Sequence, residues 1–137
     1  MRITQQYINQ LAYDIIGCAI EVHKHMGPGL LESIYEECLI YELRIKGFDV
    51  KSQIELPIVY KEKKLSKRLR LDILVNDLII VELKAIETMI PLYEAQLLSH
   101  MKLTAQPKGL LINFNCLNIT KEVVPLVNEH FAALPEK

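Results

Sequence analysis

The chain has 137 residues, half of them hydrophobic and 24% charged, and its formal net charge is −1. This length and composition predict one globular domain over residues 1–137, and the near-neutral charge gives no overall signal for nucleic acid. Three cysteines without a CxxC pair argue against a disulfide or zinc framework. The polar start and the lack of an apolar run of about 18 residues argue against a signal peptide and a membrane span, so we expect a cytoplasmic protein.

Two helices are predicted at the start of the chain. Over residues 4–25, apolar side chains recur at three- and four-residue steps, and Thr4 is suited to cap the helix at its N-terminus. The Gly-Pro-Gly sequence at 27–29 ends this helix. A second helix over about residues 30–46 ends before Gly47, a residue typical of the C′ position.

Strands separated by turns make up much of the remaining chain. The KEKK sequence and Asn76-Asp77 are both turn-prone. The remaining elements, in chain order, are strands at 48–60, 65–75 and 78–85, a helix from Pro91 to about Leu103, a strand at 108–114 and a helix from Thr120 to about Leu134. The order α-α-β-β-β-α-β-α predicts a mixed α/β (α+β) fold with a central mixed sheet.

Two central strands carry charged residues among apolar ones. Side chains alternate between the faces of a strand, so Glu82 and Lys84 share a face while Leu83 points the opposite way. A two-residue turn would place Asp72 opposite Val81, whereas a three-residue loop or a β-bulge would place Asp72 opposite Glu82. We predict the odd-length loop or the bulge, since a clean two-residue turn would abolish a shared site.

Opposed carboxylates about 5 Å apart repel each other unless a cation compensates them. Mg²⁺ prefers carboxylate and carbonyl oxygens, so Asp72, Glu82 and the Leu83 backbone carbonyl are predicted to hold Mg²⁺ or Mn²⁺. Lys84 would then steady an attacking water or a phosphoryl oxygen, an arrangement suited to metal-assisted phosphodiester hydrolysis. The alternative is a structural Glu–Lys or Asp–Arg ion pair, because a bare D-x9-E-x-K spacing often arises by chance.

The second predicted helix supplies a third carboxylate. Glu32 is the only charge on a flank that also holds Tyr35, so we expect Glu32 to border the core as an outer metal ligand. The alternative is a helix-start glutamate favoured by the macrodipole. We expect Tyr35 to lie in the core with its hydroxyl hydrogen-bonded to the acidic cluster, and Glu36 to be solvated. A separate apolar stripe of this helix consists of Leu31, Ile34, Cys38, Tyr41 and Ile45.

A basic run precedes Asp72. Residues 61–70 hold six basic residues and one acidic residue, which leaves a formal charge of −6 on the rest of the chain. Lys67, Arg68 and Arg70 are predicted to hold a phosphate backbone near the acidic centre. Because no base-reading helix or aromatic stacking run is evident, we expect sequence-nonspecific backbone contacts with nucleic acid. The alternative for the run alone is a solvated hairpin.

The run Gly29-Leu30-Leu31-Glu32-Ser33-Ile34-Tyr35 resembles the motif that names the GxxExxY family. Residues 71–85 and 93–104 are similar to later blocks of that family, so the resemblance covers about residues 10–130. The family is placed in the PD-(D/E)xK nuclease-like superfamily, which implies a restriction-endonuclease-like core. In this chain Leu71 stands where the PD-(D/E)xK motif has its proline, which is a mild variation.

The resemblance also implies roles for single residues. Asp72 and Glu82 would be the metal-binding acidic pair, Lys84 the catalytic lysine and Glu32 the first-helix glutamate. Gln96 would match the glutamine of a QxxxY element that approaches the substrate. His100 stands at the tyrosine of that element, on the same helix face as Gln96, where it would contact phosphate. The alternative for His100 is a surface or partly buried helix residue.

Two functions follow from these observations. The first is a Mg²⁺-dependent nuclease in which Asp72, Glu82 and Glu32 hold metal, and Gln96 and His100 orient the substrate. The second is a non-catalytic domain for nucleic-acid binding or protein interaction that retains the fold. A small domain without an obvious recognition element is compatible with action as a homodimer. Neither the choice between DNA and RNA nor the mode of cutting follows from the sequence.

Overall fold

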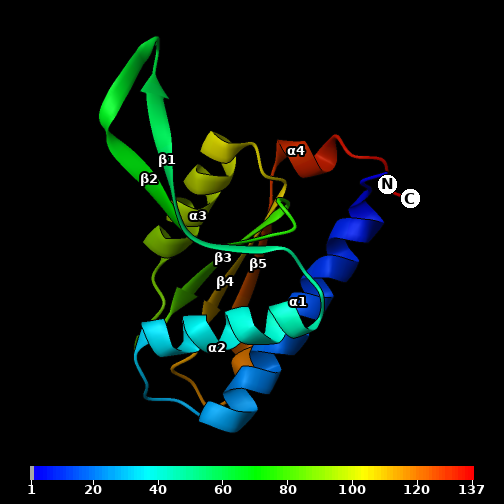
Figure 1. Cartoon of the computed structure of the whole chain (residues 1–137), viewed down its shortest axis with the longest axis vertical. Helices are drawn as coiled ribbons and strands as arrows, with labels where there is room; N and C mark the ends of the chain where they lie inside the picture. The colour runs from blue at the N-terminus through cyan, green and yellow to red at the C-terminus, as the bar shows by residue number, and fades with distance from the viewer. Residues whose placement is uncertain (1) are drawn as a thin grey trace.

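A computed structural model describes residues 2–137 and begins with two helices, α1 (Gln5–Met26) and α2 (Glu32–Ile45) (Figure 1). The Thr4 hydroxyl accepts the Tyr7 N–H at 3.0 Å, which confirms the predicted N-cap. Gly27 has a φ of 68° just after α1. Gly47, with a φ of 87°, follows the C-cap residue Lys46, so its predicted C′ position is confirmed.

The sheet has five strands in the order β1-β2-β3-β4-β5. The neighbours β3 and β4 are parallel, and the other three neighbouring pairs are antiparallel. The strands are β1 (Val50–Tyr60), β2 (Lys63–Val75), β3 (Ile79–Lys84), β4 (Lys108–Asn113) and β5 (Val123–Val127). Helix α3 (Pro91–Thr104) connects the parallel strands. The predicted mixed α/β fold with a mixed sheet is confirmed.

The prediction of a helical tail is wrong for most of its length. After a 3₁₀ helix at Ile119–Glu122, the chain forms β5 and only then the short helix α4 (Glu129–Ala132). The β5 sequence VVPLV is rich in β-branched residues, which favour strands. Its Pro125 has no N–H and is tolerated because β5 is an edge strand. Pairing with the fully buried β4 therefore decides the conformation here.

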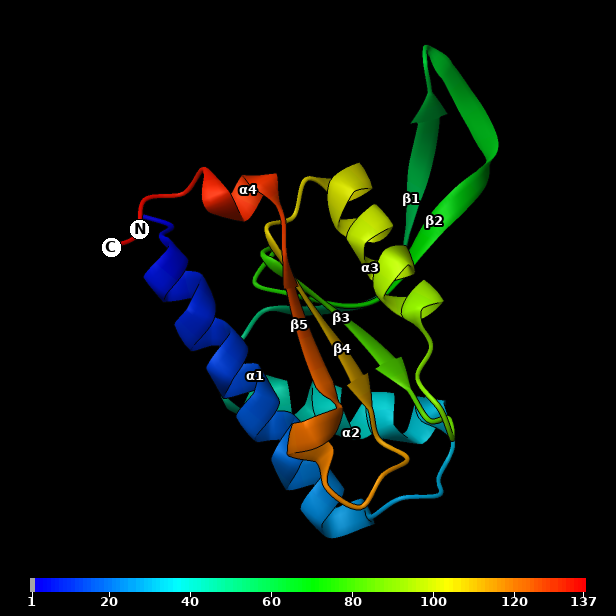
Figure 2. The same ribbon diagram turned by 180° about the vertical axis from the view of Figure 1, so that it is seen from behind.

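Helices cover both faces of the sheet, with α1 and α2 on one face and α3 on the other (Figures 1 and 2). Alternation along β3 directs Val81 and Leu83 toward α1 and α2, and Ile80 toward α3. Both clusters consist of buried apolar side chains, and their burial favours the stacking of the helices on the sheet. In residues 2–137, none of the helices has the length and apolar character needed to cross a membrane.

Close packing of α3 on β4 makes Gly109 a position without room for a side chain. A Cβ there would lie 2.8 Å from Met101 Sδ and 2.9 Å from Leu97 Cγ. We expect Gly109→Ala to lower the free energy of unfolding by about 1–3 kcal/mol, because the core must shift to admit the methyl group. Urea unfolding measures this, with Gly17→Ala as the control.

The Gly17→Ala control isolates the steric effect. A Cβ at Gly17 would meet nothing within 4 Å, and Gly17 lies inside α1. The control should therefore raise the free energy of unfolding by about 0.5–1 kcal/mol, since alanine is the better helix former. If both variants changed stability in the same direction and by the same amount, the close packing at Gly109 would be contradicted.

Strands β1 and β2 continue beyond the sheet as a two-stranded arm, defined here as residues 54–71 (Figures 1 and 2). Only Ile73, Leu74 and Val75 of β2 pair with β3, although β2 is 13 residues long. At the base of the arm, Gln53 lies across from Asp72 and has a φ of 49°, unusual for a residue with a side chain. Asp72 thus sits where the arm leaves the sheet.

Candidate active site

A three-residue loop, Asn76-Asp77-Leu78, joins β2 to β3. Asn76 and Asp77 have φ values of 51° and 54°, and the Leu78 N–H donates to the Val75 carbonyl at 3.0 Å. The strands pair Val75 with Ile79 and Ile73 with Val81, so the next step of this register sets Asp72 opposite Glu82. The predicted odd-length loop is confirmed.

The Asp72 carboxylate takes the place of a strand-to-strand hydrogen bond. Its Oδ2 accepts the Leu83 N–H at 3.0 Å, beyond the last paired residues of β2 and β3. The N–H and C=O of one strand residue point to the same side, so the Leu83 carbonyl also lies on the side of Asp72. Where β2 and β3 separate, the Asp72 carboxylate and the Leu83 carbonyl therefore lie on the same side. These are the two groups predicted to hold a metal together with Glu82.

Helix α3 brings a histidine to the acidic pair. His100 Nδ1 is hydrogen-bonded to Glu82 Oε1, and the two side chains are only 21% and 13% exposed. The contact of His100 with a substrate phosphate, expected from the sequence, stays a prediction. Gln96 is exposed one turn earlier on the same helix. The contact of His100 with Glu82 was not foreseen, because it depends on how α3 packs on the sheet.

Lys84 is held by an aromatic ring from the first turn of α3. Its Nζ lies 4.4 Å from the centroid of Tyr93, a distance at which a cation is attracted to the ring face. Sequence reasoning missed Tyr93. The available signal was its spacing, since Tyr93, Gln96 and His100 follow one another at three- and four-residue steps on one helix face.

The beginning of α2 lies next to the end of β3 (Figures 1 and 2), so that Glu32 feels the charges of Lys84 and Glu82. Contrary to expectation, Glu32 is exposed, because it occupies the first turn of α2. Glu36, expected to be solvated, is half-buried and accepts the Gln53 Nε2 hydrogen bond at 2.6 Å. A glutamate one turn after Glu32 on the same face was the signal for this second carboxylate.

Negative charge accumulates at this site without full compensation. Burial and, next, the negative charge of Glu82 together raise the pKa of Asp72 to about 7, although the hydrogen bond from the Leu83 N–H lowers it. Burial also raises the pKa of Glu32, although Lys84 lowers it. A bound cation would relieve the repulsion among these carboxylates.

The donor set fits a hard divalent ion that retains water. Within residues 2–137, no three His, Cys, Asp or Glu side chains are close enough together to hold a metal. The oxygen groups that the structure offers to such an ion here are the Asp72 and Glu82 carboxylates and the Leu83 carbonyl. Mg²⁺ is commonly bound in this way, by one or two carboxylates with several waters.

The structure places Tyr35 away from the acidic cluster, and the expected hydrogen bond to that cluster is wrong. Its hydroxyl donates to the Gly27 carbonyl at 2.5 Å and accepts the Leu30 N–H at 3.1 Å. Its ring is buried and stacks on Phe114, with centroids 4.7 Å apart. Helical spacing turns Tyr35 inward under the loop, so it holds the loop from which α2 begins.

We expect Tyr35→Phe to lower the free energy of unfolding by about 1–2 kcal/mol. The substitution leaves the Gly27 carbonyl and the Leu30 N–H without their partner. Urea unfolding measures the change, and Tyr41→Phe is the matched control because Tyr41 is 66% exposed. The control should stay within about 0.5 kcal/mol of the wild type. Equal stability of both variants would contradict the role given to the hydroxyl.

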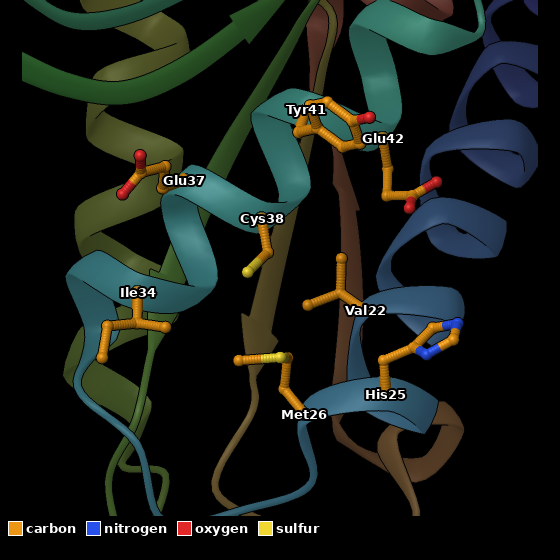
Figure 3. Close-up of a pocket in the computed structure, with 8 residues that line it drawn as sticks. All are labelled: Val22, His25, Met26, Ile34, Glu37, Cys38, Tyr41 and Glu42. Carbon is orange, nitrogen blue, oxygen red and sulfur yellow. The ribbon is translucent and has the colours of Figure 1, made fainter.

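A hollow between α1 and α2, separate from the acidic pair, has a volume of about 370 Å³ (Figure 3). Val22 and Met26 of α1 face Cys38 and Tyr41 of α2 across it. The apolar stripe predicted on α2 is therefore not the buried one. The structure buries Tyr35, Leu39 and Leu43 instead and leaves Leu31, Tyr41 and Ile45 largely exposed. None of the predicted site residues lines this hollow.

The charged residues of the arm are exposed, among them Lys67, Arg68 and Arg70.

A family model described as the PD-(D/E)XK nuclease superfamily matches residues 9–125, from α1 into β5. No curated protein and no solved structure matches the chain. The matched region includes Asp72, Glu82 and Lys84, and it covers most of the chain. The chain therefore belongs to the PD-(D/E)XK nuclease superfamily.

Proposed function

We propose that this protein is a metal-dependent nuclease of the GxxExxY family that hydrolyses phosphodiester bonds in nucleic acid. The observation that carries the proposal is the three-residue loop after β2, which sets Asp72 across from Glu82 on strands that part at this point. Lys84 lies two residues after Glu82 and completes the group. Residues 1–137 would act as one domain.

Asp72, Glu82 and the Leu83 carbonyl would hold Mg²⁺ or Mn²⁺, with Glu32 reaching the ion from α2 through water. The raised pKa of Asp72 supports this assignment, because its cause is burial beside another carboxylate. A divalent ion bound there would polarise the phosphate and lower the pKa of the attacking water.

The remaining residues would bind and orient the substrate. Lys84 would stabilise the negative charge that develops on the phosphate. Gln96 and His100 of α3 would orient the scissile phosphate, and the charges of Arg68 and Arg70 would hold its neighbours. Lys67 would add a further backbone contact farther along the arm. Such contacts favour the phosphate backbone over particular bases.

Tyr93 would act as a positioning residue for Lys84. We expect Tyr93→Leu to lower kcat about tenfold with little change in KM, because Lys84 loses the ring that holds its ammonium group. Tyr93→Phe keeps the ring and should retain most of the activity. Steady-state cleavage assays on the two variants test this, and equal losses in both would contradict the cation–π role.

Incubation of the purified chain with supercoiled plasmid DNA and with a folded RNA, each in Mg²⁺ and in Mn²⁺, tests the proposed activity. We expect metal-dependent cleavage of at least one substrate, abolished by chelation and by Asp72→Asn. A contaminating nuclease would also cleave in the Asp72→Asn sample. Folded protein that cleaves neither nucleic acid with either metal would contradict the proposal.

The second candidate is a non-catalytic domain for nucleic-acid binding or protein interaction. The contact between Glu82 and His100 favours it, because the histidine satisfies the carboxylate without a metal. The exposed apolar residues Tyr41 and Ile45 of α2 also favour it, since they offer a surface for a partner or for a homodimer. Metal binding at Asp72 separates the two candidates.

A further inference from the structure

The arm carries positive charge from the edge of the acidic site out to its tip. Between Lys61 and Arg70 it has six basic residues and one acidic residue, and all of the charged side chains are exposed. The pairing of β2 with β3 ends at Ile73, and the outer part of the arm projects from the body (Figures 1 and 2). A positive surface on an otherwise acidic protein is suited to a polyanionic partner, and the length of the arm sets how far along that partner it reaches.

At its base, one face of the arm packs against the core, and this packing sets the direction in which the opposite face points. Leu69 and Leu71 pack in the apolar cluster under α3, with Ile54 and Leu56 of β1 against them. Arg70 alternates with these leucines and so lies on the opposite face. Its charge acts on Glu32 at the acidic site. Arg70 therefore places positive charge of the arm beside the acidic site.

The composition of the arm does not suit binding to single-stranded nucleic acid. Proteins that bind single strands stack successive bases on a series of aromatic side chains. Residues 54–71 contain one aromatic residue, Tyr60, which is 62% exposed at the tip. A two-stranded β-ribbon, in contrast, fits the major groove of a duplex or follows its phosphates.

The length of the arm sets a distance along that duplex. Lys63 lies nine residues before Asp72 on β2, a span of about 30 Å at the rise of an extended strand. Phosphates of one strand of a duplex are spaced about 3.4 Å apart along the axis. The tip therefore reaches about nine base pairs from the site.

We propose that the partner of the arm is a double-stranded nucleic acid, and that the arm contacts its phosphates on one side of the acidic site, out to about nine base pairs. This inference rests on the proposed function and deepens it, because it names the substrate as a duplex with a minimum length on one side. It also assigns a role to Lys61, Lys63 and Lys64 at the tip.

Fluorescence anisotropy in chelator measures binding without cleavage. The probes are fluorescein-labelled DNA and RNA duplexes of about 8, 14 and 24 base pairs, and single strands of matching length. The variants are Lys61→Gln/Lys63→Gln/Lys64→Gln at the tip and Lys24→Gln/Lys121→Gln/Lys137→Gln as a control. The control removes the same charge from exposed lysines outside the arm.

We expect wild type to prefer duplexes of about 14 base pairs or more over the shortest duplex and over single strands. The tip variant should weaken duplex binding about 10- to 100-fold and lower the slope of log K against log salt by about 2 to 3, from the loss of three phosphate contacts. The control variant should stay within about twofold of wild type.

Two results would overturn the inference. One is equal duplex affinity of the tip and control variants, and the other is a wild-type preference for single strands. Neither depends on catalysis. A protein that binds duplexes through the arm but never cleaves them would support this inference and contradict the nuclease proposal. A protein that cleaves nucleic acid, but whose tip and control variants bind duplexes equally, would contradict only the inference.

Discussion

Replacement of Lys84 by alanine is expected to lower kcat for phosphodiester cleavage by about 10²- to 10³-fold, the usual loss when one stabiliser of transition-state charge is removed. Lys84 lies on the same strand face as Glu82, and its ammonium group is held over the Tyr93 ring. Single-turnover cleavage of a labelled duplex measures the effect, because it separates chemistry from product release.

The matched control is Lys102→Ala on α3, where the lysine is exposed and near the end of the helix. The control should keep the wild-type rate. Urea unfolding of both variants excludes a loss of structure as the cause. If Lys84→Ala cleaved within about threefold of wild type, transition-state stabilisation by Lys84 would be contradicted.

Replacement of Asp72 by asparagine is expected to stabilise the metal-free protein at pH 8 by on the order of 2 kcal/mol. The pKa of Asp72 rises from 3.8 to about 7 on folding. Above pH 7 Asp72 is ionised in both states, and its ionisation costs more free energy in the folded state than in the unfolded state. The full shift would correspond to about 4 kcal/mol. We halve it because the site is partly open to solvent and shared with Glu82.

The sign of the pH dependence follows from this shift. Because the folded pKa lies above the unfolded one, the folded state binds more protons between about pH 4 and 7, and wild-type stability falls as the pH rises through that range. The advantage of Asp72→Asn should therefore shrink as the pH is lowered from 8 to about 5.5. Urea unfolding in chelator at the two pH values measures it.

The same experiment separates a metal site from a structural ion pair. Addition of Mg²⁺ at pH 8 should stabilise wild type and leave Asp72→Asn unchanged, because a ligand that binds only the folded state stabilises it. An Asp72 that served a structural pair with Arg70 would give the opposite result. In that case Asp72→Asn would be less stable than wild type at pH 8, with or without Mg²⁺.

Local patterns were sufficient to predict the elements that depend on neighbouring residues. The cap at Thr4 and the C′ glycine at Gly47 follow from short-range hydrogen bonding and from backbone freedom. The odd-length loop followed from chemistry, because charged Asp72 and Glu82 in core strands require a common face. These signals lie within a few residues of the features that they predict.

Other features depend on pairings between distant segments. The tail was predicted to be helical, but the ladder with β4 makes Val123–Val127 a strand. The helix α2 has two apolar flanks, and only its packing on α1 and the sheet decides that Tyr35 is buried and Tyr41 exposed. Local periodicity is equal for both flanks and does not choose between them.

The same limit applies within the candidate site. Contacts of Glu82 with His100, Lys84 with Tyr93 and Glu36 with Gln53 join residues that are 18, 9 and 17 positions apart in the chain. They arise from the placement of α3 and α2 beside the strands. A resemblance to known motifs points to Glu82 and Lys84, but not to the groups that hold them.

Isothermal titration of Mg²⁺ and Mn²⁺ into wild type, Asp72→Asn and Glu82→Gln tests the central claim most directly. The structure brings Asp72 and Glu82 together at the point where β2 and β3 part, and predicts one shared site. We expect binding to wild type that is lost in both variants while each remains folded. Absence of binding to wild type, or binding that neither substitution changes, would contradict a metal site at this acidic pair.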